Sequence, residues 1–301
     1  MRTYAKNKDL TQGPITKTLL LFSAPMIAGN LLQQLYNVVD TLIVGHFIGP
    51  DALASVGASY ALMVFLTSIL LGLCMGSGVV FSMRFGAREM DELKNSLFVS
   101  FIFIGFITCL ITAASFFFID PIIRLLQIPD DIREMTKDYL LVIFCGIGFT
   151  FLYNYFSSLL RGIGNSAVPL LFLAVSALLN IVLDLFFVVS CSMGVEGAAL
   201  ATILGQVLTF LISALYLRKP KVLQVSRRDM KLSFRTAKTV MGYGVSSFIT
   251  QIAITVSILV SNNMIVQYGA ASVYGPDIPL AAFGIVMKVY QISVSYTHLR
   301  A

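Results

Sequence analysis

The chain has 301 residues, of which 57% are hydrophobic and only 12% charged, about half the charged fraction of an ordinary soluble domain. This composition excludes a soluble globular protein, because long segments are apolar on every side and leave no polar face for water. The basic residues that give the net charge of +6 lie between these segments, which indicates charged loops rather than a nucleic-acid-binding surface. A membrane barrel would alternate polar and apolar residues, and these segments do not. The sequence predicts an all-α integral membrane protein.

Apolar windows long enough to cross a bilayer recur along the chain. Six precede a basic stretch, a seventh follows it and an eighth starts near Pro279. The first seven windows cover 17–47, 52–83, 96–119, 138–160, 168–190, 197–217 and 238–268. The first window is long enough to be tilted or bent, and a helix kink is expected at Pro25 because proline removes a helical hydrogen bond.

Basic residues gather on one side of the predicted membrane. The amino-terminal segment, the connections at 84–95 and around Arg161, and the stretch 218–238 together hold sixteen lysines and arginines. The opposite side holds three, namely Arg124, Arg133 and Lys137. Because cytoplasmic loops carry the excess of Lys and Arg, the N-terminus is predicted to be cytoplasmic.

Two short stretches recur in the same order on the two sides of the basic stretch. Ile43-Val44 recurs as Ile265-Val266, and residues 52–57 resemble 279–284. Both copies start on the cytoplasmic side, which indicates a parallel repeat. We therefore expect an N-lobe of six transmembrane helices at 1–217, a cytoplasmic basic linker at 218–237 and the start of a C-lobe at 238–294. The last residues, 295–301, turn polar within the eighth window, and we expect them to be a foreign tail on a truncated chain.

Two acidic residues lie well inside predicted spans rather than at their first residue, and ionisable side chains there are functional candidates. Asp40 is in the first span, and it shares one helix face with Gln33, Tyr36 and Asn37 at spacings of seven, four and three residues. Asp184 is in the fifth span. An acid near the end of a span can also reach the lipid headgroups, so a structural role stays open for both.

Uncharged oxygen ligands accompany the second acid. Asn180 lies one turn before Asp184, and Thr202 forms a polar pair with Gln206 in the sixth span. Carboxyl groups in a low-dielectric site can exchange protons near neutral pH, and together these oxygens would also suit a small hard cation. We predict a site for H⁺ or Na⁺ at Asp40, Asn180, Asp184 and Thr202.

Other polar residues of the spans fit either a cavity lining or hydrogen bonds between helices. Tyr153 and Asn154 in the fourth span belong to this group, together with Gln33, Tyr36 and Asn37 of the first span and Gln206 of the sixth. The segment Asp130-Asp131-Ile132-Arg133-Glu134 faintly resembles an acid-rich magnesium box, but the chain has no second copy. The sequence also has no HExxH motif, phosphate loop or Ser/His/Asp set, and its cysteines stand singly. We expect no enzymatic activity and no cofactor beyond the coupling ion.

Three stretches, at 23–49, 160–169 and 194–202, carry a family resemblance. They include Ala24-Pro25, Val39-Asp40, Leu160-Arg161-Gly162 and Glu196-Gly197-Ala198-Ala199. With the span plan, they make the chain similar to the multidrug and toxic compound extrusion (MATE) family, in its DinF-like or MepA-like branch.

The resemblance implies twelve spans in two six-helix lobes around a central cavity that opens alternately inward and outward. It implies export of amphipathic, often cationic compounds in exchange for protons or sodium. It assigns Asp40, Asn180, Asp184 and Thr202 to an amino-lobe cation site. In a branch similar to NorM an acid of the seventh span takes part, but residues 260–264 here contain none.

The expected partners are therefore the lipid bilayer and amphipathic small molecules, not nucleic acid. The expected state is a monomer in the bacterial inner membrane. Two alternatives stay open. The first is a lipid-linked oligosaccharide flippase of the same superfamily, whose cavity should be rich in Arg and Lys. The second is a membrane scaffold protein that transports nothing.

Overall fold

The computed structural model describes residues 15–126, 128–217 and 230–270, and every regular element in these ranges is a helix. Two of the short elements, η1 and η3, are π-helical, and η2 is a 3₁₀ helix. The elements are α1 (Ile15–Ile43), η1 (Val44–Ile48), α2 (Pro50–Gly86), α3 (Met90–Phe117), α4 (Ile119–Leu125), η2 (Asp130–Ile132), α5 (Arg133–Gly162), α6 (Ala167–Asp184), η3 (Leu185–Ser190), α7 (Gly194–Leu217) and α8 (Phe234–Ala270).

Six helical segments of the described chain are long and apolar enough to cross a membrane. They are Thr18–Ile48, Leu62–Gly86, Met90–Phe117, Asp130–Gly162, Ala167–Ser190 and Gly194–Leu217. These segments confirm the six spans predicted before the basic linker. A helix suits this environment because it satisfies its own backbone hydrogen bonds where no water is present.

The seventh predicted window is confirmed as a helix, because α8 runs over 37 residues. It begins at Phe234, four residues before the predicted start at 238. α8 is not among the six candidate spans, and its crossing of the membrane stays a prediction. The eighth window and the tail at 295–301 lie outside the described residues, as does most of the linker.

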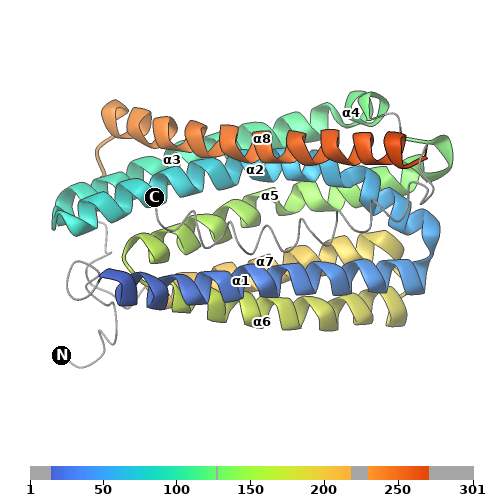
Figure 1. The fold of residues 1–301 in the computed structure, drawn as a ribbon, viewed down its shortest axis with the longest axis horizontal. Coiled ribbons are helices and arrows are strands. Elements are labelled where there is room, and N and C mark those ends of the chain that lie inside the picture. The colour runs from blue at the N-terminus through green and yellow to red at the C-terminus, as the bar shows by residue number, and fades with distance from the viewer. Residues whose placement is uncertain (1–14, 127, 218–229, 271–301) are drawn as a thin grey trace.

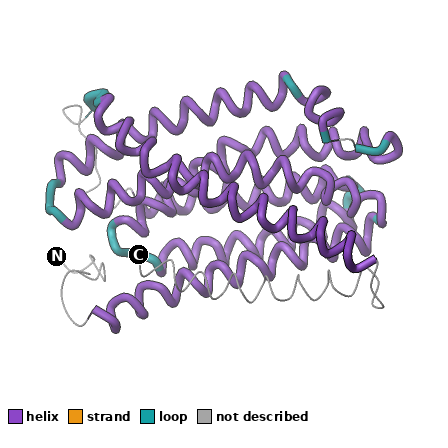
Figure 2. Tube along the Cα trace, turned by 45° about the horizontal axis from the view of Figure 1, so that its top comes forward, coloured by secondary structure: helices purple, strands orange, loops and turns teal. Residues whose placement is uncertain are grey.

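The helices form two packed groups that are joined by α5 (Figure 1). In one group α6 contacts both α1 and α7, and in the other α2 contacts both α3 and α8. α5 contacts α2, α3 and α7, so it connects the groups (Figure 2). The main apolar core lies among α2, α3 and α5, where Phe81, Leu93 and Phe144 are completely buried.

The closest helix contact that glycines permit is between α2 and α8. A Cβ atom added at Gly76 would lie 2.8 Å from the carbonyl oxygen of Val240, and it would overlap the backbone of Gly244. A Cβ atom at Gly72 would lie 2.9 Å from the carbonyl oxygen of Gly244. Only residues without a side chain let the two backbones approach this closely.

A sharp turn at Gly49 connects η1 to α2. Gly49 is the single residue between them, and its φ of 125° is a conformation that side-chain-bearing residues rarely adopt. Pro50 follows as the first residue of α2, where its missing N–H costs no helical hydrogen bond. This turn reverses the chain directly after the end of α1 that carries Asp40.

Candidate functional site

The two predicted acids face each other across the contact between α1 and α6. The carboxyl groups of Asp40 and Asp184 lie within reach of a shared hydrogen bond. Asp184 is completely buried and Asp40 is half-buried. Two ionised carboxylates at this separation repel each other, so a proton or a small cation between them would stabilise the pair.

Local sequence positions α6 against α1. The hydroxyl of Ser166, just before α6, donates to the backbone carbonyl of Phe22 in α1 at 2.7 Å. Asn165 accepts from the backbone N–H of Val168 through Oδ1 at 3.2 Å, which satisfies a free donor in the first turn of α6. Farther along, Gly29 brings the α1 backbone close to Leu170 of α6.

The acid pair leaves oxygen atoms without partners. Within the described chain, both carboxylate oxygens of Asp184, Oδ1 of Asp40 and Oδ1 of Asn180 are buried and accept no hydrogen bond from a donor group. A buried acceptor without a partner costs about 1–3 kcal/mol, and more when it is charged. These oxygens therefore form an acceptor cluster that a proton or a cation would complete.

Thr202 of α7 borders the same cluster. Asn180 donates through Nδ2 to Thr202 Oγ1 at 3.5 Å, and Thr202 in turn donates to the carbonyl of Ala198 at 3.1 Å. The bond orients the Asn180 amide so that Nδ2 is on the side of α7. Asp40 of α1 thus meets Asp184 of α6, and Asn180, one turn before Asp184, meets Thr202 of α7. All four side chains offer oxygen atoms, which suit a hard cation.

Tyr139 of α5 belongs to this neighbourhood, although the sequence reasoning missed it. Its hydroxyl lies near enough to Asp40 and Asp184 to interact electrostatically with both. Its ring packs on a small apolar cluster formed by Ile43, Val44, Ala52, Val188, Val195 and Ala198. α5 therefore supplies a hydroxyl, that of Tyr139, near the acid pair.

Both acid-bearing helices change to π-helix next to the acids. α1 continues as η1 four residues after Asp40, and α6 becomes η3 directly after Asp184. The two π segments contact each other, and their wider winding appears in bonds spanning five residues, such as Cys191 N–H to Phe186 O at 3.0 Å. π-helical turns are less stable than α-helix and occur often at functional sites.

The predicted cavity residues of α1 lie on its more exposed side. Gln33 and Asn37 are exposed, and Tyr36 is half-buried and hydrogen-bonded to Gln33. Tyr36 also lies near Tyr153 of α5. α1 runs through Pro25 as one uninterrupted helix, and the kink there stays a prediction.

The remaining predicted polar residues form hydrogen bonds within the bundle. Asn154 is buried and donates to the carbonyl of Thr150 at 2.8 Å. Thr150 also donates to Gln206 Oε1 at 2.6 Å and so connects α5 to α7. Gln206 thus takes part in a hydrogen bond between helices, whereas the bond of Asn154 stays within α5, and a cavity role for both stays a prediction.

Arg161 differs in position from its predicted place in a loop. It lies in the last turn of α5, half-buried, and donates through Nη2 to Ser158 Oγ at 3.3 Å. The last turn of a helix favours a cation because the free carbonyl groups there carry partial negative charge. Its charge therefore sits at the end of the bundle rather than in a connection.

The chain matches the MatE family over residues 25–186, a segment that contains Asp40, Asn180 and Asp184. It belongs to the MatE family. The all-α membrane fold expected from the resemblance is thereby confirmed, and so is the family itself.

Curated relatives and solved structures of the MatE family agree with this assignment. The chain is 30% identical over 287 residues to "Probable multidrug resistance protein YpnP" of Bacillus subtilis, covering 95% of this chain and 63% of that protein. It is 27% identical over 288 residues to "Multidrug export protein MepA" of Staphylococcus aureus, covering 93% of this chain and 61% of that protein. The structure titled "Crystal structure of MATE in complex with MaL6" superposes with a TM-score of 0.88 at 26% identity, covering 98% of this chain and 64% of that one.

The chain thus spans less than two thirds of the length of these relatives. What the comparisons establish for it is a MatE-family integral membrane protein in a lipid bilayer. The division into an N-lobe, a linker and the start of a C-lobe stays a prediction.

Proposed function

We propose that this protein is a secondary active antiporter that exports amphipathic, often cationic compounds in exchange for H⁺ or Na⁺. The observation that carries the proposal is the buried pair of Asp40 and Asp184, whose oxygens lack donors among the described residues. Ionisable groups inside a membrane are costly and persist where they bind or move ions.

The coupling ion binds at the acid pair, with Asn180 and Thr202 as further oxygen ligands. Its positive charge relieves the repulsion between the carboxylates and draws α1 and α6 together. Release of the ion restores the repulsion. η1 and η3 follow the two acids and contact each other. A change in the separation of the two carboxyl groups is therefore transmitted through this contact to the end of α1.

Export follows when the packing of α1 that the cation favours is incompatible with bound substrate. In this scheme the cation state of the acids determines how α1 packs, with bending at Pro25. Gln33 and Asn37, exposed on α1, contact the substrate. A ligand shifts such an equilibrium only by its difference in affinity for the two states, so cation and drug must favour different packings of α1.

The names of the relatives support the substrate class. YpnP and MepA are named as multidrug resistance and multidrug export proteins. The excess of Lys and Arg in the predicted loops supports a cytoplasmic N-terminus, and the bacterial relatives support location in the plasma membrane.

Ethidium efflux from cells that express the complete gene tests the proposal. The proton gradient and the sodium gradient are collapsed separately, and membrane expression is measured in parallel. Efflux that stops with one of the gradients identifies an exporter and its coupling ion. Absence of efflux from protein that is present in the membrane contradicts the proposal and favours the lipid flippase.

A further inference from the structure

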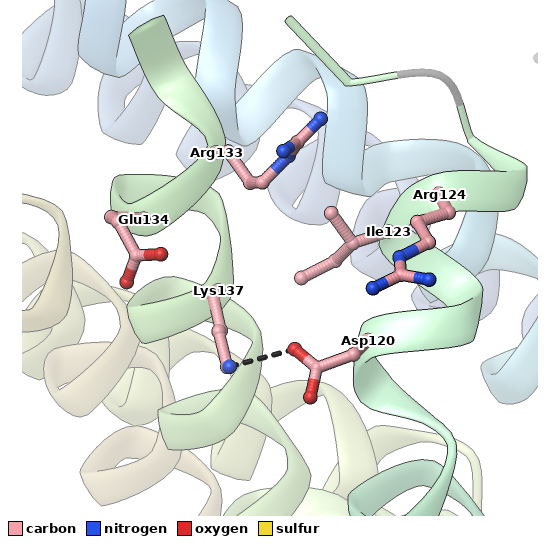
Figure 3. Close-up of a pocket in the computed structure, with 6 residues that line it drawn as sticks. All are labelled: Asp120, Ile123, Arg124, Arg133, Glu134 and Lys137. Atoms are coloured by element: carbon pink, nitrogen blue, oxygen red, sulfur yellow. Dashed lines mark hydrogen bonds and ion pairs between the residues drawn. The ribbon is translucent and has the colours of Figure 1, made fainter. Parts of the chain in front are cut away.

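A charged pocket lies between α4 and the start of α5, and none of the acid-pair residues lines it. It has a volume of about 150 Å³ and is lined by Asp120, Ile123, Arg124, Arg133, Glu134 and Lys137 (Figure 3). α4 follows one candidate span directly, and the next begins at Asp130, so the pocket lies where the chain leaves the membrane and re-enters it.

Two of the three pocket cations are already neutralised by ion pairs. Lys137 binds Asp120 at 2.7 Å, and Arg133 binds Asp130, outside the pocket lining, at 2.6 Å. Neither Arg124 nor Glu134 forms an ion pair with any part of the chain that the structure describes. Arg124 and Glu134 are therefore the pocket charges that no direct ion pair neutralises, and Glu134 interacts with the charge of Lys137 at longer range.

The charged groups of Arg124 and Glu134 are not in contact with each other. In Figure 3 the guanidinium of Arg124 and the carboxylate of Glu134 lie on opposite sides of the pocket, with the Lys137–Asp120 pair between them. Ile123 is only 3% exposed and gives the pocket an apolar wall. A complementary ligand carries an anion and a cation a short distance apart.

Three exposed phenylalanines precede the pocket residues of α4 in the chain. Phe116, Phe117 and Phe118 come directly before α4, and they are 38%, 80% and 50% exposed. Exposed aromatic residues at the end of a membrane span are typical of contact with lipid. The pocket residues of α4 therefore follow directly, in the chain, a segment whose rings can contact lipid.

We propose that this pocket binds the headgroup of an ethanolamine phospholipid. The phosphate binds Arg124, the primary ammonium binds Glu134, and the acyl chains lie along Phe116–Phe118. A guanidinium matches phosphate oxygens with paired N–H donors, and an ammonium donates charge-assisted hydrogen bonds to a carboxylate. The proposal does not depend on the transport function.

Native mass spectrometry of the full chain in mixed micelles tests this assignment. Equal amounts of phosphatidylethanolamine, phosphatidylglycerol and phosphatidylcholine are supplied. The pocket is expected to retain phosphatidylethanolamine preferentially, because phosphatidylglycerol lacks an ammonium and the choline group has no N–H donor. Arg124→Ala and Glu134→Gln should each weaken that retention about tenfold, the effect of losing one charge-assisted hydrogen bond.

Matched controls are Arg235→Ala and Asp91→Asn, exposed residues at the starts of α8 and α3. They should leave lipid retention unchanged, and Arg124→Lys should keep part of it because the charge remains. Equal retention of the three lipids, or unchanged retention in Arg124→Ala and Glu134→Gln, would overturn the proposal.

Discussion

Asp40 of α1 and Asp184 of α6 meet within hydrogen-bonding reach, although 144 positions separate them in the sequence. Asp184 has no solvent exposure, and neither of its carboxylate oxygens accepts a hydrogen bond from a donor group of the described chain. The pair therefore behaves as one charge site shared by two helices, and this relationship underlies the first two predictions.

The first prediction concerns the two acids together. Asp40→Asn and Asp184→Asn should each abolish cation-driven efflux, and the double variant should be no worse than either single variant. Residues that act as one unit give strongly non-additive effects, because removal of either destroys the shared site. Efflux rates and membrane expression of the three variants check this. Additive losses would indicate two independent sites.

The second prediction concerns Tyr139, whose hydroxyl interacts with both acids. Tyr139→Phe should weaken the apparent affinity for the coupling ion about fivefold, because a polar group beside the site is lost while the ring still packs. Tyr60→Phe is the control, since Tyr60 is 68% exposed. The measurement is efflux as a function of coupling-ion concentration. An unchanged affinity would limit Tyr139 to packing.

The third prediction concerns the contact between α2 and α8. Gly76→Ala should destabilise the fold by about 1–3 kcal/mol, because the new methyl overlaps the backbone of α8. Gly242→Ala on the same helix pair meets no atom within 4 Å and should be neutral or stabilise by up to about 1 kcal/mol. Thermal unfolding in detergent measures both. Equal midpoints would show that the close contact can relax at no cost.

The fourth prediction concerns a buried hydroxyl in the main core. Tyr155 donates to the carbonyl of Leu97 at 2.7 Å and lies 3.0 Å from Ser100 Oγ, which ties α5 to α3. Tyr155→Phe should cost about 1–3 kcal/mol, because it leaves buried polar groups without a partner. Tyr268→Phe, at a residue 67% exposed, should change unfolding little. A similar midpoint for the two variants would contradict this role.

The sequence predicts the helices well because a lipid environment excludes most other backbone conformations. Backbone groups in hydrocarbon must bond within the helix, so each long apolar window becomes one. The differences are at the ends. α8 begins before the predicted window and Arg161 belongs to α5, because hydropathy marks the apolar part of a helix and not its capped, charged ends.

The candidate site was predicted for α1, α6 and α7 because an acid inside a span is conspicuous. Tyr139 was missed because a tyrosine near the start of a span resembles an interfacial anchor. Its level in the membrane is the signal that could have identified Tyr139 as a site residue. Successive spans alternate in direction, so the start of α5 lies level with the ends of α1 and α6, where Asp40 and Asp184 are.

The π-helical segments could not be read from the sequence. Leu185–Ser190 reads LFFVVS and Val44–Ile48 reads VGHFI, and both runs fit an ordinary apolar helix. A π turn depends on how the helix packs against its neighbours, and here η1 and η3 pack on each other. Hydrophobic periodicity alone does not contain that information.

Drug-driven cation movement in proteoliposomes tests the central claim most directly. The complete protein is reconstituted, and an ethidium gradient is applied in one direction and then in the other. H⁺ and Na⁺ fluxes are recorded for the parent protein, Asp40→Asn, Asp184→Asn and Asp51→Asn. Asp51 is an exposed acid in the first turn of α2 and serves as the control. We expect flux of one cation opposite to the drug in the parent and in Asp51→Asn, and none in the other two variants. Drug-driven cation flux that persists in Asp40→Asn and Asp184→Asn would contradict it.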